Sequence, residues 1–318
     1  MPKPHICDPS LFDQDLHGRC YVVTGANSGI GLATAKQLAL QGAQVVVACR
    51  RVAEGEARIA EIRAEHPEAQ MEARALDLGD LASVRAFAEA FLTDHDRLDG
   101  LVNNAGIMNT PASKTADGFE SQIGVNHLGH FLLTNLLLDV LKRSAPSRIV
   151  ILSSCYHDVA MGRRGDIDLD DLHFERRPYD GWEAYAQSKL ANLHHARGLA
   201  ARLEGTGVTA VSVHPGWVRT NLAKNTMPVW VQDMLLRPVF RLMGMIEPWE
   251  GAQTTLHCLL DPSVPEHPGA YYSQIGIYRD KAAKAGGWPM RSPNPKAEDA
   301  SLTEGLWRAS EALVGAAT

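Results

Sequence analysis

The chain has 318 residues, of which 45% are hydrophobic and 21% are charged, and its formal net charge is −6. This composition is ordinary for a folded protein, and the length suits one large α/β domain. The acidic balance provides no basic field for nucleic acid or for an anionic membrane, so we expect neither as a partner.

No stretch approaches the roughly 20 uncharged apolar residues that a membrane-spanning helix needs. Residues 1–15 contain proline, aspartate and histidine and lack the apolar centre of a signal peptide. The five cysteines are widely spaced without a C-x-x-C pair, which indicates free thiols in a reducing compartment. We therefore expect a cytoplasmic protein without a membrane span.

Short hydrophobic runs alternate with amphipathic helical stretches, as in a parallel sheet covered on both faces. The predicted strands are 20–23, 44–49, 71–76, 101–103, 148–153, 209–213 and 270–272. One predicted helix starts at Leu32, and another has Asp80 as its N-cap. The other predicted helices cover 52–65, 119–141, 182–203 and 302–314. The pattern predicts a Rossmann-type doubly wound parallel sheet of about seven strands in one dinucleotide-binding catalytic domain, 1–318, with a C-terminal extension at 276–318.

A glycine-rich turn joins the first predicted strand to the first helix and reads Thr24-Gly25-Ala26-Asn27-Ser28-Gly29-Ile30-Gly31. Glycines permit a tight turn and a close backbone approach, and the helix N-terminus presents N–H groups to a pyrophosphate. The spacing is G-x-x-x-G-x-G rather than the more familiar G-x-G-x-x-G. We predict that Gly25, Asn27, Ser28, Gly29, Ile30 and Gly31 bind a dinucleotide; a plain strand–helix connector is the alternative.

Two arginines, Arg50 and Arg51, follow the second predicted strand, and the nearest acid is Glu54. A carboxylate at this place would accept a hydrogen bond from the ribose 2′-hydroxyl of NAD, whereas a 2′-phosphate needs arginine. We therefore predict NADP(H), with Arg50 as the main phosphate contact and Arg51 as the second. Two solvated arginines at the start of a helix are the alternative.

Tyr185 and Lys189 are four residues apart in a predicted helix, so they lie on the same face. An ammonium beside a phenol favours the phenolate and lowers its pKa from about 10 toward working pH. Such a phenol can donate and accept the proton of a carbonyl–alcohol interconversion. The pair alone is a weak signal, and the glycine turn upstream gives it chemical meaning.

These motifs occur in the order and rough spacing of the short-chain dehydrogenase/reductases, which the chain resembles over roughly residues 15–275. They are Thr24-Gly25-x-x-x-Gly29-Ile30-Gly31, Asn103-Asn104-Ala105-Gly106, Ser153-Ser154, Tyr185-x-x-x-Lys189 and Pro215-Gly216. Within that superfamily, segments 114–120, 124–134 and 250–258 resemble the retinol dehydrogenase branch. The resemblance implies the fold and the hydride chemistry more specifically than it implies a substrate.

The resemblance also implies cofactor contacts beyond the glycine turn. Asp77 and Leu78 match the position that touches the adenine ring, and Asn104, Ala105 and Gly106 match the floor beneath the cofactor, although a purely structural role in the sheet fits the latter equally. Pro215, Gly216, Val218 and Thr220 match the loop that flanks the nicotinamide carboxamide.

The implied catalytic residues are Asn126, Ser154, Tyr185 and Lys189. Tyr185 exchanges the proton, Lys189 also holds the nicotinamide ribose, and Ser154, favoured over Ser153, donates a hydrogen bond to the reacting oxygen. Asn126 is implied to bind a water that relays protons to Lys189; a locally bonded core amide is the alternative.

The substrate side is less specific. The segment 222–247 is rich in methionine and aromatic residues, and its counterpart in the family forms a lid. An adaptable apolar lid suits a small hydrophobic substrate such as a retinoid, a steroid, or a long-chain or aromatic aldehyde or ketone. The expected substrate contacts are Ser154, Tyr156, Trp217, Met227 and Trp230. Plain core or an oligomer interface is the alternative for this segment.

The resemblance also implies expectations about membrane anchoring and oligomeric state. Vertebrate retinol dehydrogenases of this branch generally have a hydrophobic N-terminal anchor, which this sequence lacks. Homodimers and tetramers are common in the superfamily through helices like 182–203, so the resemblance implies a homo-oligomer. The histidines at 127, 130, 194 and 195 have no obvious third partner, and we expect no metal site.

Two other functions are open. A light-dependent protochlorophyllide reductase would share 116–119 and 126–131, but that group has a cysteine after Pro-Gly, where this chain has Trp217, and prefers Asn-Ala-Ala to 104–106. A non-catalytic nucleotide-sensing protein would not need Asn126, Ser154, Tyr185 and Lys189 together. The expected activity is therefore NADP(H)-dependent hydride transfer to or from a hydrophobic alcohol or carbonyl.

Overall fold

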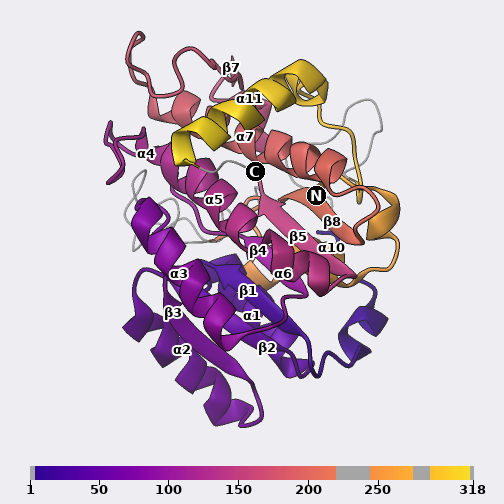
Figure 1. Cartoon of the computed structure of the whole chain (residues 1–318). Helices are drawn as coiled ribbons and strands as arrows, with labels where there is room; N and C mark the ends of the chain where they lie inside the picture. The colour runs from indigo at the N-terminus through magenta and orange to yellow at the C-terminus, as the bar shows by residue number, and fades with distance from the viewer. Residues whose placement is uncertain (1–3, 220–243, 275–286, 316–318) are drawn as a thin grey trace, which may run out of the picture.

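The structure is a computed structural model that describes residues 4–219, 244–274 and 287–315. Its centre is a parallel sheet with the strand order β3-β2-β1-β4-β5-β8-β9 (Figure 1). The strands are β1 (Cys20–Thr24), β2 (Gln44–Cys49), β3 (Met71–Ala75), β4 (Gly100–Asn103), β5 (Ser147–Leu152), β8 (Val208–His214) and β9 (Tyr271–Ser273). Every adjacent pair is parallel, which confirms the predicted doubly wound sheet.

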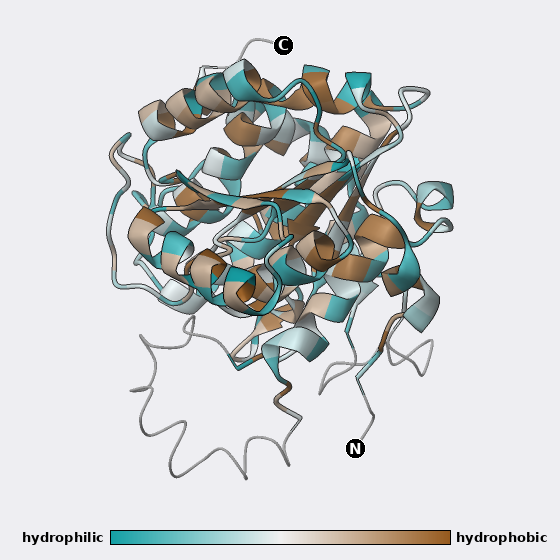
Figure 2. Ribbon diagram, turned by 90° about the horizontal axis from the view of Figure 1, so that it is seen from below, coloured by the Kyte–Doolittle hydropathy of each residue, from teal (hydrophilic) through white to brown (hydrophobic). Residues whose placement is uncertain are grey.

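Successive strand residues face opposite sides of the sheet, and each side packs under its own helices. Val23 and Val47 belong to the core beneath α1 (Gly29–Leu40), α2 (Val52–Glu65) and α10 (Pro248–Leu260). Val22 and Val46 belong to the core beneath α3 (Leu81–Asp94), α5 (Gly129–Leu136), α6 (Leu138–Arg143) and α7 (Gly181–Arg202). Figure 2 shows the resulting arrangement, with hydrophobic strands inside and hydrophilic turns on the outer helices.

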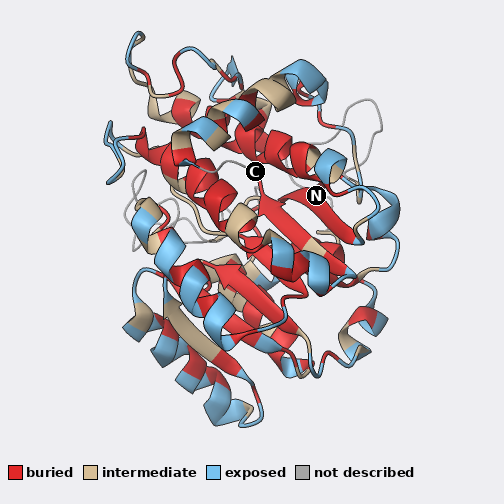
Figure 3. Ribbon diagram, viewed as in Figure 1, coloured by how far each residue is buried: buried red, intermediate tan, exposed pale blue. Residues whose placement is uncertain are grey.

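The last helix, α11 (Ala300–Val314), packs against α7 and adds a further layer outside it. Trp307 of α11 lies so close to Gly198 of α7 that a Cβ there would be 2.6 Å from the indole Cε3. Because α7 is covered by the sheet on one side and by α11 on the other, it is buried along most of its length, whereas α2 and α3 expose their outer faces (Figure 3).

The predicted helix 119–141 is divided in the structure into α4 (Ser121–Ile123), a π-helical turn η2 (Gly124–Leu128), α5 and α6. The wide turn contains Asn126, and Gly129 follows it directly. A Cβ on Gly129 would lie 2.4 Å from the Leu78 carbonyl oxygen, so the loop after β3 reaches the helix backbone itself. Single π turns often occur at functional sites in proteins.

Two further departures from the prediction lie beside the site. Strands β6 (Val159–Ala160) and β7 (Arg163–Arg164) form a short antiparallel hairpin between β5 and α7. Residues 287–290 return to lie beside β9, where the Met290 N–H donates to the carbonyl of Tyr271 at 2.8 Å. The remaining short helical turns are η1 (Pro9–Asp13), η3 (Cys155–His157), η6 (Val264–Glu266) and η7 (Pro295–Glu298).

Within the described residues, no helix combines the length and apolarity needed to cross a bilayer. All five cysteines belong to this part of the chain, where each is buried and has a free thiol.

Candidate active site

The predicted site residues lie at one edge of the sheet, because the carboxyl ends of parallel strands point the same way. The glycine turn follows β1, Arg50 follows β2, Asp77 follows β3, Asn104 follows β4 and Ser154 follows β5. Tyr185 and Lys189 come to this edge on the first turns of α7.

Glycine is required in the first turn for two separate reasons. Gly25 has φ +67°, and a Cβ there would be 2.9 Å from the Ala105 Cβ. Gly31 has no such backbone strain, but a Cβ would be 2.5 Å from the Asn104 side-chain nitrogen and 3.0 Å from the Ala26 Cα. The turn is therefore pressed against the loop after β4, and helix α1 begins directly behind it.

The start of α1 is left open for an anion. Ser28 is the N-cap residue of α1, and its exposed side chain makes no cap hydrogen bond. Asn27 donates to the Glu54 carboxylate at 3.1 Å, and Ile30 packs beside Gly251 of α10. Uncapped N–H groups at a helix N-terminus are suited to binding phosphate. The cradle therefore fits the pyrophosphate of a dinucleotide.

Thr24 fastens the loop after β4 to the glycine turn. Its hydroxyl oxygen accepts from the backbone N–H groups of Asn104 and Ala105, both at 2.9 Å. The hydroxyl also lies 2.9 Å from His130 Nε2, and the Asn104 side chain donates to the Thr24 carbonyl at 2.7 Å. His130 Nδ1 lies 3.0 Å from the Asn126 carbonyl oxygen, so its hydrogen is on Nδ1 and Thr24 donates to Nε2.

Asn126 is fully buried and its amide is fully engaged by protein groups. The side-chain oxygen accepts from the Ile107 N–H at 2.8 Å, while the side-chain nitrogen donates to the Ile107 carbonyl and to the Ser188 hydroxyl, both at 2.9 Å. Asn126 thus holds the end of the loop after β4 against α7. A Cβ added to Gly106 would be 3.1 Å from Asn126 Oδ1 and 3.5 Å from Lys189 Nζ, so these groups surround one point.

Lys189 is buried beside the phenol of Tyr185. Its Nζ lies 5.7 Å from the centroid of the Tyr185 ring and donates to the Leu152 carbonyl at 3.0 Å. Burial lowers the pKa of Lys189 to about 8. The ammonium form therefore still predominates at neutral pH.

The Tyr-x-x-x-Lys spacing predicts a lowered pKa for Tyr185, and here the structure gives the opposite direction. Tyr185 is only 3% exposed, and burial raises the pKa of its phenol, while a hydrogen bond with the Ser154 hydroxyl lowers it. The correction has a simple cause: loss of water disfavours the phenolate more than the polar neighbours in the protein favour it.

The two serines after β5 have different roles in the structure. The Ser153 hydroxyl donates to the Lys189 backbone carbonyl at 2.7 Å, so it fixes α7 to the strand. The Ser154 hydroxyl accepts from the Tyr156 N–H at 3.3 Å and is the one that reaches Tyr185. This geometry agrees with the preference for Ser154 over Ser153.

The residues expected to contact the adenosine end differ in exposure: the two arginines are exposed, Asp77 is half-buried and Leu78 is buried. Arg50 is exposed, and among the described residues it has no ion-pair partner, whereas Arg51 pairs with Glu54 at 3.0 Å. Asp77 accepts from the Gly79 N–H at 2.9 Å. Leu78 is buried against Gly129. Arg50 is thus the better placed of the two arginines to bind an added anion.

An aromatic pair lies next to Tyr185. The Tyr156 ring is 6.0 Å from the Tyr185 ring in an edge-on arrangement and 5.2 Å from the Trp182 ring. Trp182 did not emerge as a site residue from the sequence, although its position three residues before Tyr185 places it nearly one helical turn away on α7. These rings provide an apolar wall beside the phenol.

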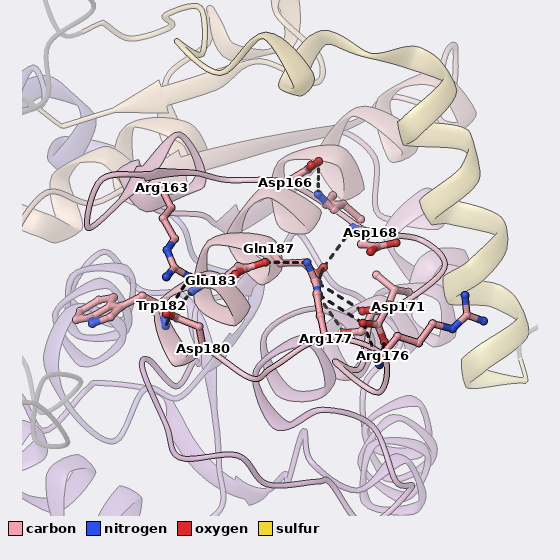
Figure 4. Close-up of polar contacts among 12 residues, drawn as sticks. Arg163, Asp166, Asp168, Asp171, Arg176, Arg177, Asp180, Trp182, Glu183 and Gln187 are labelled. Atoms are coloured by element: carbon pink, nitrogen blue, oxygen red, sulfur yellow. Dashed lines mark hydrogen bonds and ion pairs between the residues drawn. The ribbon is translucent and has the colours of Figure 1, made fainter.

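Ion pairs hold the chain before α7 against its first turns (Figure 4). Arg163 of the β6–β7 hairpin contacts Asp180 at 3.1 Å and Glu183 at 3.4 Å. Arg177 contacts the other oxygen of Glu183 at 2.8 Å and the Gln187 side-chain oxygen at 3.0 Å. The hairpin and the loop are thereby fixed to the helix that carries Tyr185.

The loop after β8 has the turn that the Pro-Gly motif predicts. Gly216 has φ +92°. The backbone carbonyl of Trp217 accepts from the Ile246 N–H at 2.8 Å, and Val218 forms a parallel bridge with Ile246. Pro215 begins this loop at the end of β8. Thr220, Met227 and Trp230 lie outside the described residues, as does most of the expected lid.

The described residues contain no group of three or more histidine, cysteine, aspartate or glutamate side chains arranged to hold a metal ion. His127 instead lies 2.8 Å from the Ser310 hydroxyl of α11, and its ring meets the His195 ring edge-on at 5.6 Å. Burial lowers the pKa of His127 to about 3. These histidines are therefore neutral packing residues at neutral pH.

Comparison with known proteins agrees with this geometry. The family model of short chain dehydrogenases matches residues 19–164. Retinol dehydrogenase 12 of Bos taurus is 44% identical over 95% of this chain and 88% of its own length. Retinol dehydrogenase 14 of Homo sapiens is 43% identical over 97% of this chain and 88% of its own length.

Solved structures give the same result. A crystal structure of an uncharacterized protein from Mycobacterium paratuberculosis aligns with a TM-score of 0.74 and 37% identity over 95% of each chain. A short chain dehydrogenase from Pseudomonas syringae aligns with a TM-score of 0.65 and 28% identity over 86% of this chain and 99% of that one.

The fold and the order of motifs along its edge define a short-chain oxidoreductase. With relatives this similar over nearly its whole length, the chain belongs to the short-chain dehydrogenase/reductase superfamily and, within it, to the retinol dehydrogenase branch.

Proposed function

We propose that the protein is an NADP(H)-dependent oxidoreductase that transfers a hydride between the nicotinamide and a hydrophobic alcohol or carbonyl. The observation that carries the proposal is the meeting of three buried side chains, Tyr185, Lys189 and Ser154, at the carboxyl edge of the sheet. The glycine cradle after β1 lies at that same edge.

The cofactor would be held by groups along this edge. Gly25, Gly31 and the start of α1 would receive the pyrophosphate, Arg50 the 2′-phosphate, and Lys189 the nicotinamide ribose. The chemistry that NADP(H) supplies when bound is the gain or loss of a hydride at its nicotinamide ring.

In the reductive direction, the Tyr185 hydroxyl gives its proton to the carbonyl oxygen of the substrate. The Ser154 hydroxyl donates a hydrogen bond to that oxygen and so stabilises the negative charge that develops there. The Lys189 ammonium, 5.7 Å from the Tyr185 ring centroid, stabilises the phenolate that remains. In the oxidative direction the same phenolate takes the proton of the alcohol.

Asn126 supports this chemistry through its backbone. Its carbonyl accepts from His130 Nδ1 at 3.0 Å, and we propose that the same carbonyl also binds the water that returns a proton to Lys189. Tyr156 and Trp182 form the described part of the apolar substrate wall, and Trp217, Met227 and Trp230 are proposed to complete it.

The test is a turnover screen with the purified protein. Retinal, decanal, benzaldehyde, a steroid ketone and acetaldehyde are each supplied with NADPH and, in parallel, with NADH. We expect higher kcat/KM with the larger apolar carbonyls than with acetaldehyde, and at least about tenfold higher kcat/KM with NADPH than with NADH. Preference for NADH, or no turnover of any carbonyl, would contradict the proposal. Turnover only of a light-activated chlorophyll precursor would identify a double-bond reductase instead.

A further inference from the structure

A buried histidine, His157, contacts the backbone of the loop that carries Ser154. His157 is fully buried in η3, and its Nδ1 lies 2.5 Å from the Ser154 backbone carbonyl. The same carbonyl accepts from the His157 backbone N–H at 3.0 Å. Since a carbonyl only accepts, the ring hydrogen is on Nδ1 and Nε2 is an acceptor.

The partner of Nε2 comes from the far end of the chain. The Ser292 hydroxyl lies 2.6 Å from His157 Nε2, and the Ser292 oxygen accepts from the Asn294 N–H at 3.1 Å. All donors in this relay point one way, from the Asn294 N–H to Ser292, from Ser292 to His157, and from His157 to the Ser154 carbonyl.

Asn294 joins the relay to the hairpin beside the site. Its side chain is fully buried and donates to the carbonyls of His157 at 2.7 Å and Gly165 at 2.9 Å. His157 and Gly165 flank the β6–β7 hairpin, so one amide closes the base of that hairpin. The C-terminal segment thus contacts both ends of the β6–β7 hairpin, which follows Ser154 in the chain.

The segment is itself fixed at both of its ends. Before Ser292, Met290 pairs with Tyr271 of β9 through the 2.8 Å backbone hydrogen bond. After Asn294, Glu298 contacts Arg197 of α7 at 2.5 Å. Because this segment is attached both to the sheet and to α7, its contacts can hold the loop that carries Ser154 in one position.

We propose that residues 287–298 form a working part of the active site, in which Ser292 and Asn294 position Ser154 through His157. The inference rests on the proposed function, because it assigns a purpose to the placing of Ser154 against Tyr185. His157 and Ser292 are positioning residues: they touch the backbone that carries Ser154 and not the reacting atoms. In their absence the Ser154 loop loses the bonds that set its distance from the phenol.

The test compares Ser292→Ala with a matched control, Ser144→Ala. Both serines are buried, at 6% and 5% exposure, and each accepts from one backbone N–H, that of Asn294 or Leu98. Ser144 follows α6 and contacts the residue two before β4, at the opposite edge of the sheet from Ser154. Any general cost of removing a buried hydroxyl is therefore common to both variants.

Hydrogen exchange of the backbone amides at 153–158 is the first readout, and it requires neither substrate nor cofactor. We expect Ser292→Ala to raise exchange there about tenfold and Ser144→Ala to leave it unchanged. The second readout is kcat with NADPH and decanal or retinal, for which Ser292→Ala should lose about tenfold while KM and cofactor affinity stay within twofold. In the oxidative direction Tyr185 must be deprotonated, so the acidic limb of the pH profile should move to higher pH, since the hydrogen bond from Ser154 opposes the raised pKa of Tyr185.

Further variants keep the proposal falsifiable. Ser292→Thr retains the hydroxyl and should restore kcat. Ser292→Cys keeps the volume with a weaker donor, and serves if Ser292→Ala does not fold; it should show the same direction of change. Unchanged exchange at 153–158, or raised exchange with unchanged kcat, would overturn the positioning role. Should Ser154→Ala lose about 100-fold while Ser292→Ala behaves like Ser144→Ala, the inference is wrong and the proposed function stands. Full turnover by Ser154→Ala would contradict both.

Discussion

Two sides of the site differ in how their geometry is secured. The cofactor side comprises the loops after β1, β2, β3 and β4, and its shape comes from close backbone packing at Gly25 and Gly31 beneath exposed groups such as Arg50. The catalytic side comprises the loop after β5, the start of α7 and residues 287–298, where Ser154, Tyr185 and Lys189 are 7%, 3% and 4% exposed. The first side is built from tight turns, which the buried hydroxyl of Thr24 joins to one another, and the second from a larger set of buried polar contacts that also reach the C-terminal segment.

Stability and activity are therefore coupled in different ways on the two sides. On the cofactor side, a change that spoils the backbone turn should harm folding and cofactor binding together, while a surface change should alter only recognition. On the catalytic side, removing ionisable groups from water costs folding free energy. The groups that perform the chemistry therefore also destabilise the fold.

Lys189→Met should change kcat and the melting temperature most differently. We expect kcat to fall by about 1000-fold because the phenolate loses its cation. The melting temperature should stay equal or rise, because burial already lowers the pKa of Lys189 to about 8, and the Leu152 carbonyl keeps its bond from Asn192 at 2.9 Å. Turnover assays and thermal unfolding measure the two effects, with Lys36→Met as a surface control. A clear loss of stability with retained turnover would mean that Lys189 is structural.

Gly25→Ala should damage stability and binding together. The φ of +67° costs a side chain roughly 1–2 kcal/mol, and the new methyl group would meet the Ala105 Cβ at 2.9 Å. We therefore expect a lower melting temperature and about 10- to 100-fold weaker NADPH binding by titration calorimetry. Gly205→Ala, at an equally positive φ of +76° with open space around it, is the matched control, since it should lose stability alone. Cofactor affinity that is unchanged in Gly25→Ala would remove the turn from the binding site.

Acid should weaken the buried polar contacts. Burial lowers the pKa of His130 to about 3 and that of His157 to about 4, so both stay neutral in the folded protein while the unfolded chain takes up protons below about pH 6.5. The stability is therefore fully present above that pH and decreases as the pH falls, by roughly 2 kcal/mol for each histidine at pH 5. Urea unfolding at pH 7.5 and pH 5 measures the loss, and replacing the exposed His267 by asparagine should leave it unchanged. A flat profile between these pH values would show that these rings are not held neutral.

Arg50→Ala should have the smallest effect and should act on recognition alone. An exposed arginine facing the 2′-phosphate contributes about 1.5 kcal/mol, so the NADPH-to-NADH ratio of kcat/KM should fall about tenfold. The melting temperature should not change. Arg51→Ala should lower the ratio less, because Arg51 is paired with Glu54 at 3.0 Å. An unaltered cofactor ratio in Arg50→Ala would leave the choice of NADP(H) without its main support.

Sequence patterns predict the turns and helix starts of the cofactor side well because the determinants of these elements are local. The predicted helix 52–65 is observed with those bounds, and Asp80 caps α3 by accepting from the N–H groups of Ala82 and Ser83. The motif positions of Tyr185, Lys189 and Ser154 are also brought together as predicted.

The parts that the sequence did not predict depend on contacts between distant residues. The π-helical turn at Asn126 lies beside the Leu78 loop, which comes from another strand, and no helical periodicity reveals that contact. The relay from Ser292 to His157 joins residues 135 positions apart through a single hydroxyl. The direction of the Tyr185 pKa shift also needed the structure, because spacing along a helix does not report burial.

If Tyr185 exchanges the proton during hydride transfer, Tyr185→Phe should remove nearly all of the turnover. The variant removes one oxygen atom, and its rate of NADPH oxidation with decanal and retinal is compared with that of the unmodified protein at equal cofactor saturation. We predict a loss of at least about 1000-fold in kcat with cofactor affinity preserved. Turnover equal to that of the unmodified protein, with any carbonyl, would contradict the account.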